Sequence, residues 1–373
     1  MAMHSRETFV PPRRVLASIW GPPLDEPKKA SLDAALNLRG GTAAALATPA
    51  GVPLSGGACM PAVGLGLWKV PREACAATVV NAIKQGYRHL DCACDYGNEA
   101  EVGEGIRQAI ASGLVTRDEL WVTSKLWNTY HAKEHVEPAC RRTLDDLGLE
   151  YVDLYLIHFP IALKYVPFEM RYPPEWVYDP TEPGGGKMEM VSVPVQETWQ
   201  AMEGLHAQGL AKHIGVCNFN TAGLRDLLSY AATPPSVLQV ELHPYNQQPQ
   251  LVRFCEQHAI AVTGFSPLGA GSYVELNMAT EADSALTNPT VATIASKHGK
   301  SAAQVILRWG VQRGYAVLPK STKPERLAEN LSLDDFALDA DDMAAMATLD
   351  QARRYNDPGV FCVGMGAFCP IYD

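Results

Sequence analysis

Four residues with titratable side chains lie at the ends of short apolar segments. Asp91 and Tyr96 lie in HLDCACDYGNE, Lys125 in TSKLW and His158 in LYLIHFP. A phenol is a weak acid, and a cation such as Lys125 is expected to favour its ionised form. Asp91 would hold Lys125 charged and in place, and His158 would act as a neutral donor that orients a substrate oxygen. Since no nucleophile accompanies this donor, the set indicates reduction of a carbonyl by an external hydride.

Each of these residues also has an ordinary structural explanation. A lone histidine after an apolar run is usually a structural residue, and a lysine at a strand end usually reaches water. The functional interpretation therefore depends on whether the fold brings the four side chains together.

The elements that must position them alternate regularly from Gly51 onward. Short β-rich runs are separated by amphipathic stretches such as residues 131–147. The runs are residues 62–68, 89–93, 120–126, 152–159, 213–219, 236–242, 261–268 and 316–322. Eight strand–helix units predict a closed (β/α)8 barrel rather than an open sheet. Because chemistry in such barrels sits at the C-terminal strand ends, the four residues would meet at one mouth.

Four further segments interrupt or extend this regularity. Residues 161–192 are too rich in proline and glycine for a helix, and with residues 269–287 they are expected to form long loops over the mouth. Residues 338–350 predict an extra helix, and the tail, residues 351–373, is aperiodic and could fold back over the rim.

Composition excludes several classes of protein. The chain has 373 residues, 47% of them hydrophobic, and a net charge of −10 with no dense basic run, so nucleic acid is not an expected partner. The nine cysteines include one C-x-C pair, Cys92 and Cys94, without the second pair of a zinc site; we expect reduced thiols and no metal. No apolar run approaches the ~20 residues that span a bilayer, so no membrane association is expected.

The first part of the chain differs in composition from the rest. Residues 1–48 are rich in Pro, Ala and Arg and lack a signal-peptide segment. They are expected to form a disordered leader before a single domain at 49–373, with organelle targeting as the alternative. The expected location is the cytoplasm, and the expected state a monomer or homodimer.

The cofactor is not expected to bind through a Rossmann motif. The G-x-G pairs at 64–66 and 103–105 lack the third glycine, and the Tyr-x-x-x-Lys, G-x-S-x-G and H-E-x-x-H motifs are absent. PKSTKPER instead places Lys320, Ser321, Lys323 and Arg326 at the last strand end and the start of the next helix, where an anion is favoured. This basic cluster favours NADPH over NADH; the alternative is a solvated helix start.

These residues also carry a family resemblance that runs from about Pro53 to Pro358. Through GLGLW, HLDCACDYGNEAEVG, SKLWN, LYLIHFP, VCNF, LQVELHPY, FSPLG and LPKSTKPERLAEN the chain resembles the aldo-keto reductases. The resemblance implies a (β/α)8 barrel that binds NADP(H), with Tyr96 as proton donor, Lys125 and Asp91 tuning it, and His158 orienting the carbonyl. The cofactor-binding residues it implies are Asn218 and Gln239 at the nicotinamide amide, Phe265 on the ring, Ser266 and Leu268 at the pyrophosphate, and Lys320, Ser321, Arg326, Glu329 and Asn330 around the adenosine.

Within the family, the chain is most similar to the xylose reductase and aldose reductase branch. FPIALKYVPFEMRYPP, PVQETWQAMEGL and RYNDP carry this likeness. It implies NADPH-dependent reduction of an open-chain aldose such as xylose to the polyol. The substrate pocket it implies has Trp68, Trp127 and Phe159 as walls and Asp95 and Asn356 as partners for sugar hydroxyls.

The chain departs from the family pattern at several positions. Cys217 replaces a common Ser, Phe265 replaces a Tyr, and the tail after RYNDP lacks the usual tryptophans. Glu275 is the acidic residue that would permit secondary use of NADH. Two alternatives stay open: a reductase of sugar phosphates, and a non-catalytic NADPH-binding regulatory or structural protein on the same barrel.

Overall fold

The computed structural model describes residues 51–372, so the leader expected at 1–48 lies outside the described residues. An antiparallel hairpin that the sequence did not predict comes first, with strands β1 (Gly51–Pro53) and β2 (Cys59–Pro61). Met60 of this hairpin is fully buried in a cluster with Trp121, Val237 and Ala316, which begin or nearly begin their own strands. The hairpin therefore covers the N-terminal end of the barrel and leaves the other end open.

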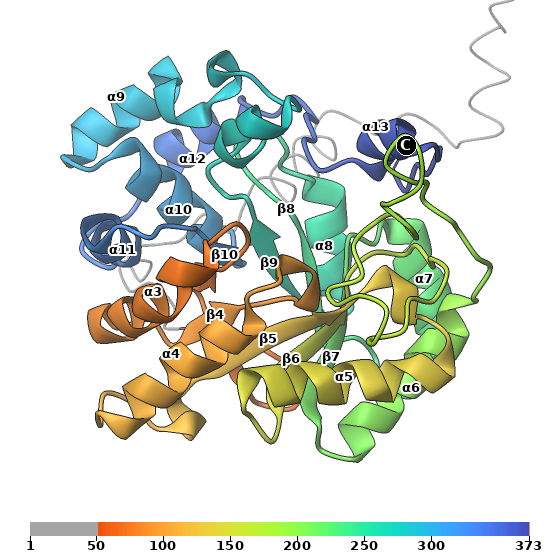
Figure 1. Ribbon diagram of the computed structural model, residues 1–373. Coiled ribbons are helices and arrows are strands. Elements are labelled where there is room, and N and C mark those ends of the chain that lie inside the picture. Colours follow the sequence, from red (N-terminus) through yellow and green to blue (C-terminus); the bar gives the residue numbers. More distant parts are fainter. Residues whose placement is uncertain (1–50, 373) are drawn as a thin grey trace, which may run out of the picture. The chain divides into compact units, whose positions relative to one another are not determined.

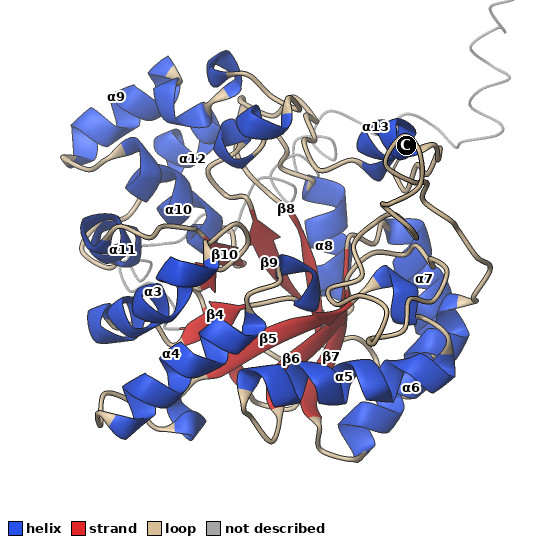
Figure 2. Cartoon of the chain, viewed as in Figure 1, coloured by secondary structure: helices blue, strands red, loops and turns tan. Residues whose placement is uncertain are grey.

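The eight predicted strands are all present and form one parallel barrel (Figures 1 and 2). They are β3 (Leu65–Gly66), β4 (His89–Asp91), β5 (Trp121–Leu126), β6 (Val152–Ile157), β7 (Ala211–Cys217), β8 (Val237–Glu241), β9 (Ala261–Phe265) and β10 (Ala316–Leu318). They are ordered as in the sequence, from β3 to β10. A parallel bridge between Val63 and Val317 joins the two outer strands, and Gly64 N–H donates to the Val317 carbonyl at 2.9 Å. The predicted (β/α)8 barrel is thus confirmed.

The helices pack around the strands in an outer layer (Figure 2). They are α3 (Arg72–Gln85), α4 (Glu99–Ala111), α5 (Lys133–Leu147), α6 (Val195–Ala207), α7 (Thr221–Tyr230), α8 (Pro249–Gln257), α9 (Pro289–His298), α10 (Ala302–Gln312), α11 (Pro324–Leu331), α12 (Ala340–Ala347) and α13 (Pro358–Phe361). Every residue of β5 and β6 is buried, because one face of each strand looks into the barrel and the other is covered by helices.

Helix α5 shows how the sequence sets this packing. Its buried residues Val136, Cys140, Leu144 and Leu147 recur every three or four positions, as the sequence predicted. The helix begins at Lys133, two residues later than expected, because residues 128–130 form a 3-10 turn. Within residues 51–372, no helix is both long and apolar enough to cross a membrane.

Long segments cover the open end of the barrel, as predicted. Residues 161–194 contain no helix or strand, and residues 269–287 contain only short 3-10 turns. The expected extra helix is α12. The tail does fold over the rim: Met188 N–H, in the first loop, donates to the Met365 carbonyl at 3.0 Å, and α13 lies beside that loop in Figure 1. The short helix α13 was not predicted.

Candidate active site

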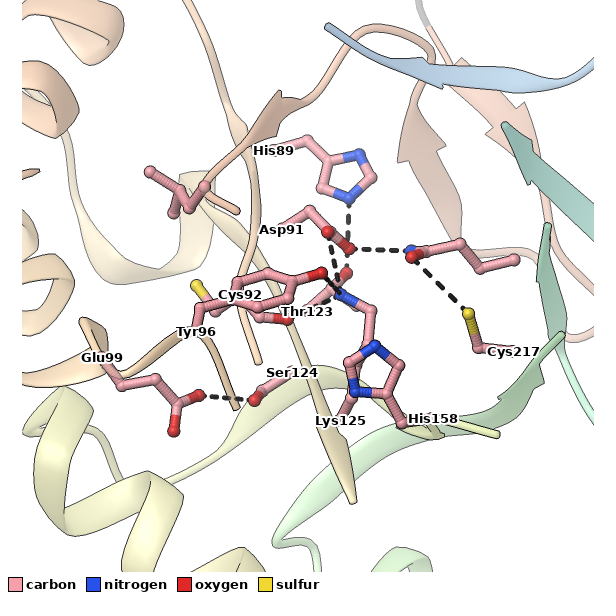
Figure 3. A network of polar contacts seen from close by, with 12 residues as sticks. His89, Asp91, Cys92, Tyr96, Glu99, Thr123, Ser124, Lys125, His158 and Cys217 are labelled. Atoms are coloured by element: carbon pink, nitrogen blue, oxygen red, sulfur yellow. Dashed lines mark hydrogen bonds and ion pairs between the residues drawn. The ribbon is translucent and has the colours of Figure 1, made fainter. Parts of the chain in front are cut away.

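A buried lysine joins the ends of strands β4 and β5 (Figure 3). Its Nζ donates to Asp91 Oδ2 at 2.8 Å, to the Cys92 carbonyl at 2.7 Å and to the Tyr96 hydroxyl at 3.1 Å. Lys125 is completely buried, so its charge must be matched by these oxygens. Gln239 Nε2 donates to Asp91 Oδ1 at 2.7 Å and so occupies the other oxygen of that carboxylate. Five residues from three distant stretches therefore form one hydrogen-bonded group.

Parallel pairing explains how this group forms. β4 and β5 are neighbours in register, with Asp91 beside Thr123. Lys125, two residues further along β5, therefore projects to the same side as Thr123, just beyond the end of β4. Tyr96 follows on a 3-10 turn, residues 94–96, that ends at Gly97 in a left-handed conformation with φ 66°. The tyrosine is thereby turned back toward the lysine.

The pKa of Tyr96 differs from the sequence expectation. Burial raises the pKa of Tyr96 above its usual value, and the Asp91 carboxylate adds to the rise. Lys125 acts in the expected direction but does not outweigh burial, because Asp91 neutralises much of its field. The phenol is consequently protonated at neutral pH, so the group is a proton donor rather than a phenolate.

Lys125 itself stays charged. Burial alone lowers the pKa of a lysine, but the Asp91 carboxylate reverses this effect and holds the pKa of Lys125 above its ordinary value. The expectation that Asp91 keeps the lysine cationic is consistent with this arrangement. The hydroxyl oxygen of Tyr96 therefore lies 3.1 Å from a fixed positive charge, which would stabilise it once its proton has left.

His158 lies beside Tyr96, with ring centroids 6.0 Å apart. Burial lowers the pKa of His158 well below its usual value, and Lys125 and His131 lower it further. The ring is therefore neutral, as the sequence reasoning expected, and can donate one N–H. Its Nδ1 is buried without a hydrogen-bond partner among the described residues. Trp127 packs edge-on against the ring at 5.1 Å and Phe159 stacks on it at 5.0 Å, which fixes its plane.

A cavity of about 1050 Å³ opens at the C-terminal end of the barrel above these residues. Three of the four proposed catalytic residues line it: Asp91, Tyr96 and His158. The fourth, Lys125, lies directly beneath Tyr96. Of the expected cofactor residues, those on the cavity wall are Asn218, Gln239, Phe265, Ser266, Leu268, Lys320 and Arg326. The expected Ser321, Glu329 and Asn330 do not line it: Ser321 and Asn330 are buried, and Glu329 is half-buried on α11.

The two amides near the cavity floor are tightly held. Asn218 Nδ2 donates to the His158 carbonyl at 2.9 Å, and Gln239 is tied to Asp91 as described above. Cys217 lies beside both amides; its Sγ is 3.3 Å from Asn218 Nδ2 and 3.8 Å from Gln239 Oε1. A thiol makes weaker hydrogen bonds than a serine hydroxyl, so the amides depend on their other partners.

All five expected substrate residues also line the cavity: Trp68, Asp95, Trp127, Phe159 and Asn356. Burial, with the nearby Glu175 carboxylate, raises the pKa of Asp95 to about 7. Asn356 Oδ1 is buried without a hydrogen-bond partner among residues 51–372. Both side chains offer polar atoms that a bound hydroxyl could satisfy.

Several wall residues were not identified from the sequence. Trp176 comes from the first rim loop and lies 4.9 Å from Trp127 and 5.2 Å from Phe361 of the tail, measured between ring centroids. Tyr273 and Tyr355 stack at 5.6 Å and join the second loop to the tail. The aromatic residues in these aperiodic segments were the available signal, but segments without periodicity do not show which way a side chain points.

Comparison with known proteins places this geometry in a family. The model of the aldo/keto reductase family matches residues 61–351. A probable NAD(P)H-dependent D-xylose reductase of Arthroderma otae is 49% identical over 325 residues, which cover 87% of this chain and 98% of that protein. An NAD(P)H-dependent D-xylose reductase of Aspergillus niger is 46% identical over 323 residues, covering 86% and 98%.

Solved structures agree with the sequence relatives. The aldose reductase of Schistosoma japonicum superposes with a TM-score of 0.74 at 36% identity, covering 85% of this chain and 96% of that one. An aldo-keto reductase of Bombyx mori in complex with NADP gives a TM-score of 0.72 at 36% identity, covering 83% and 95%. A family match over most of the barrel, together with relatives near half identity, shows that this chain belongs to the aldo/keto reductase family.

Proposed function

We propose that this protein reduces the aldehyde of open-chain aldoses such as xylose to the polyol, with NADPH as the reductant. The observation that carries this proposal is the Asp91–Lys125–Tyr96 group at the cavity floor, with neutral His158 beside it. Xylose reductases from two fungi, described above, support the choice of substrate and cofactor.

The cavity fits a phosphorylated dinucleotide. Lys320 and Arg326 are exposed cations on its wall at the end of β10 and the start of α11, where a 2′-phosphate would find charge partners. The amides of Asn218 and Gln239 would bind the nicotinamide carboxamide, and the ring of Phe265 would stack on the nicotinamide. Ser266 and Leu268 would line the pyrophosphate. Bound there, NADPH supplies a hydride for the carbonyl carbon.

The residues of the chain supply the remaining chemistry. Tyr96 enters protonated and donates its proton to the carbonyl oxygen as that oxygen gains negative charge. Lys125 then stabilises the phenolate, and Asp91 keeps Lys125 charged and in place. His158, which is neutral, donates an N–H to the same oxygen and fixes its direction. No covalent intermediate with the protein is needed.

The walls account for a sugar rather than an alkyl aldehyde. Trp68, Trp127 and Phe159 would exclude water around the carbonyl, while Asp95 and Asn356 would accept or donate hydrogen bonds to sugar hydroxyls. A sugar would leave costly unpaired polar groups in an entirely apolar pocket, and these two residues remove that cost.

We further propose a single reductase domain at 49–373, preceded by a leader at 1–48, acting in the cytoplasm as a monomer or homodimer. The start of the family match at residue 61 supports the boundary. The nine cysteines, all within residues 51–372, form no disulfide there, which supports the proposal of a reducing compartment.

Steady-state rates with xylose and with glucose 6-phosphate, each with NADPH and with NADH, test this function. We expect the unphosphorylated aldose and NADPH to give the higher kcat/KM, read from NADPH absorbance. A large preference for the phosphate ester would instead indicate a sugar-phosphate reductase. Tight NADPH binding without reduction of any aldehyde in a broad panel would indicate a non-catalytic protein.

A further inference from the structure

The last described residue of the chain reaches the active site. The Tyr372 hydroxyl donates to Asn218 Oδ1 at 3.0 Å, although 154 positions separate the two residues. Two contacts hold the tyrosine in place. The Arg354 guanidinium lies 3.5 Å from the centre of its ring, and Asn220 Nδ2 donates to the Ile371 carbonyl at 3.2 Å. The end of the tail is therefore docked on the barrel.

The side-chain amide of Asn218 is held at both ends. Its Nδ2 donates to the His158 carbonyl at 2.9 Å, which requires the NH2 group on that side and leaves Oδ1 facing the tail. Tyr372 then donates to that oxygen. Asn218 is buried and lines the large cavity, so these two hydrogen bonds set the direction in which its amide meets a ligand there. The remaining lone pair of Oδ1 is available to a ligand in the cavity.

We propose that Tyr372 is a positioning residue for the cofactor: its hydroxyl fixes the Asn218 amide in the orientation that binds the nicotinamide carboxamide. The inference rests on the proposed NADPH-binding function and assigns to the C-terminus a role in holding the cofactor. Because Cys217 makes only a weak contact with the same amide, the Tyr372 hydroxyl carries more of the restraint than it would beside a serine.

Tyr372→Phe tests this role, because it removes the hydroxyl and keeps the ring under Arg354. A neutral hydrogen bond contributes enough to change binding by roughly two- to tenfold. We expect the dissociation constant for NADPH, measured by fluorescence quenching, to rise by that factor, with the melting temperature nearly unchanged. Tyr151→Phe is the matched control. It removes a hydroxyl that donates to Asp118 at the opposite end of the barrel, and NADPH binding should not change.

A double-mutant cycle separates positioning from general packing. If Tyr372 acts through Asn218, then Tyr372→Phe should have almost no further effect on NADPH binding in an Asn218→Ala background. An equal loss in both backgrounds would show that the hydroxyl acts independently of Asn218, and wild-type binding by Tyr372→Phe alone would also overturn the inference. The cycle measures only the dissociation constant of NADPH. It therefore tests the role of Tyr372 even if the protein reduces phosphate esters or no aldehyde at all.

Discussion

The floor of the cavity consists of Asp91, Tyr96 and Lys125, and its rim consists of the two long loops and the tail. These two regions are held together in different ways. At the floor, Lys125 is fully buried and has three oxygen partners within 3.1 Å, which neighbouring strands in register and the turn after β4 place. At the rim, loops meet through contacts such as the Lys69–Glu275 ion pair, in which the Glu275 side chain is 67% exposed. Buried charges are sensitive to the loss of a partner, whereas exposed pairs contribute little. The rate of the chemical step should therefore depend on the floor. The choice of ligand should depend on many weak contacts at the rim.

The largest effect should come from removing the proton donor at the floor. Tyr96→Phe should lower kcat/KM for the aldehyde by roughly 100- to 10,000-fold, since a positioned general acid contributes about that much. NADPH binding, followed by fluorescence quenching, should be retained.

Tyr355→Phe is the matched change at the rim. It removes a hydroxyl that donates to the Asp283 carbonyl at 3.1 Å, and we expect less than a tenfold loss. Similar losses in the two variants would break the distinction between floor and rim.

A buried carboxyl just behind the floor should make stability depend on pH. Glu99 accepts hydrogen bonds from Ser124 Oγ at 2.5 Å and from Thr143 Oγ1 at 3.1 Å. Ser124 directly precedes Lys125 on β5. Burial raises the pKa of Glu99 from 4.5 to about 7. Between these values the folded protein binds more protons than the unfolded chain, so the free energy of unfolding falls as pH rises from about 4.5 to 7. The full loss is about 3 kcal/mol.

Glu99→Gln should remove this dependence, because the amide resembles the protonated acid. Urea unfolding at pH 5 and pH 8 measures the difference, and the variant should lose less stability at pH 8 than the wild type. The rim control is Glu275→Gln. In the wild type, hydrogen bonding to Lys69 lowers the pKa of the exposed Glu275 carboxyl. A pH profile for Glu99→Gln that matched the wild type would show that Glu99 is ionised in the folded protein.

The floor was predictable from the sequence because its information is local. A strand end followed by a polar residue can be recognised without the fold, and the parallel barrel then brings Asp91, Lys125 and His158 to one mouth. The net rise in the pKa of Tyr96 was not predictable, since it depends on how much water the folded cavity excludes. The hairpin at β1 and β2 was missed because strands of three residues show no clear alternation.

The rim was predicted only in outline. The loops at 161–192 and 269–287 could be placed by their composition, but side-chain directions within them depend on contacts between distant segments. Trp176 and Tyr372 therefore became visible only in the structure. Glu329 and Asn330 on α11 do not line the cavity, so their contact with the adenosine end of the cofactor stays a prediction.

A difference between the two cofactors sharpens the comparison within the rim itself. Arg326→Ala should weaken NADPH about tenfold and leave NADH almost unchanged, because the proposed partner of this exposed cation is the 2′-phosphate, which only NADPH carries. Glu275→Gln is the control. Its carboxylate lies 2.6 Å from Lys69 Nζ, so it should affect both cofactors equally and by less than about threefold. Dissociation constants for the two cofactors measure both variants. Equal losses with Arg326→Ala would place the 2′-phosphate elsewhere, and a selective loss of NADH with Glu275→Gln would mean that this carboxylate leaves Lys69 to bind a free ribose hydroxyl.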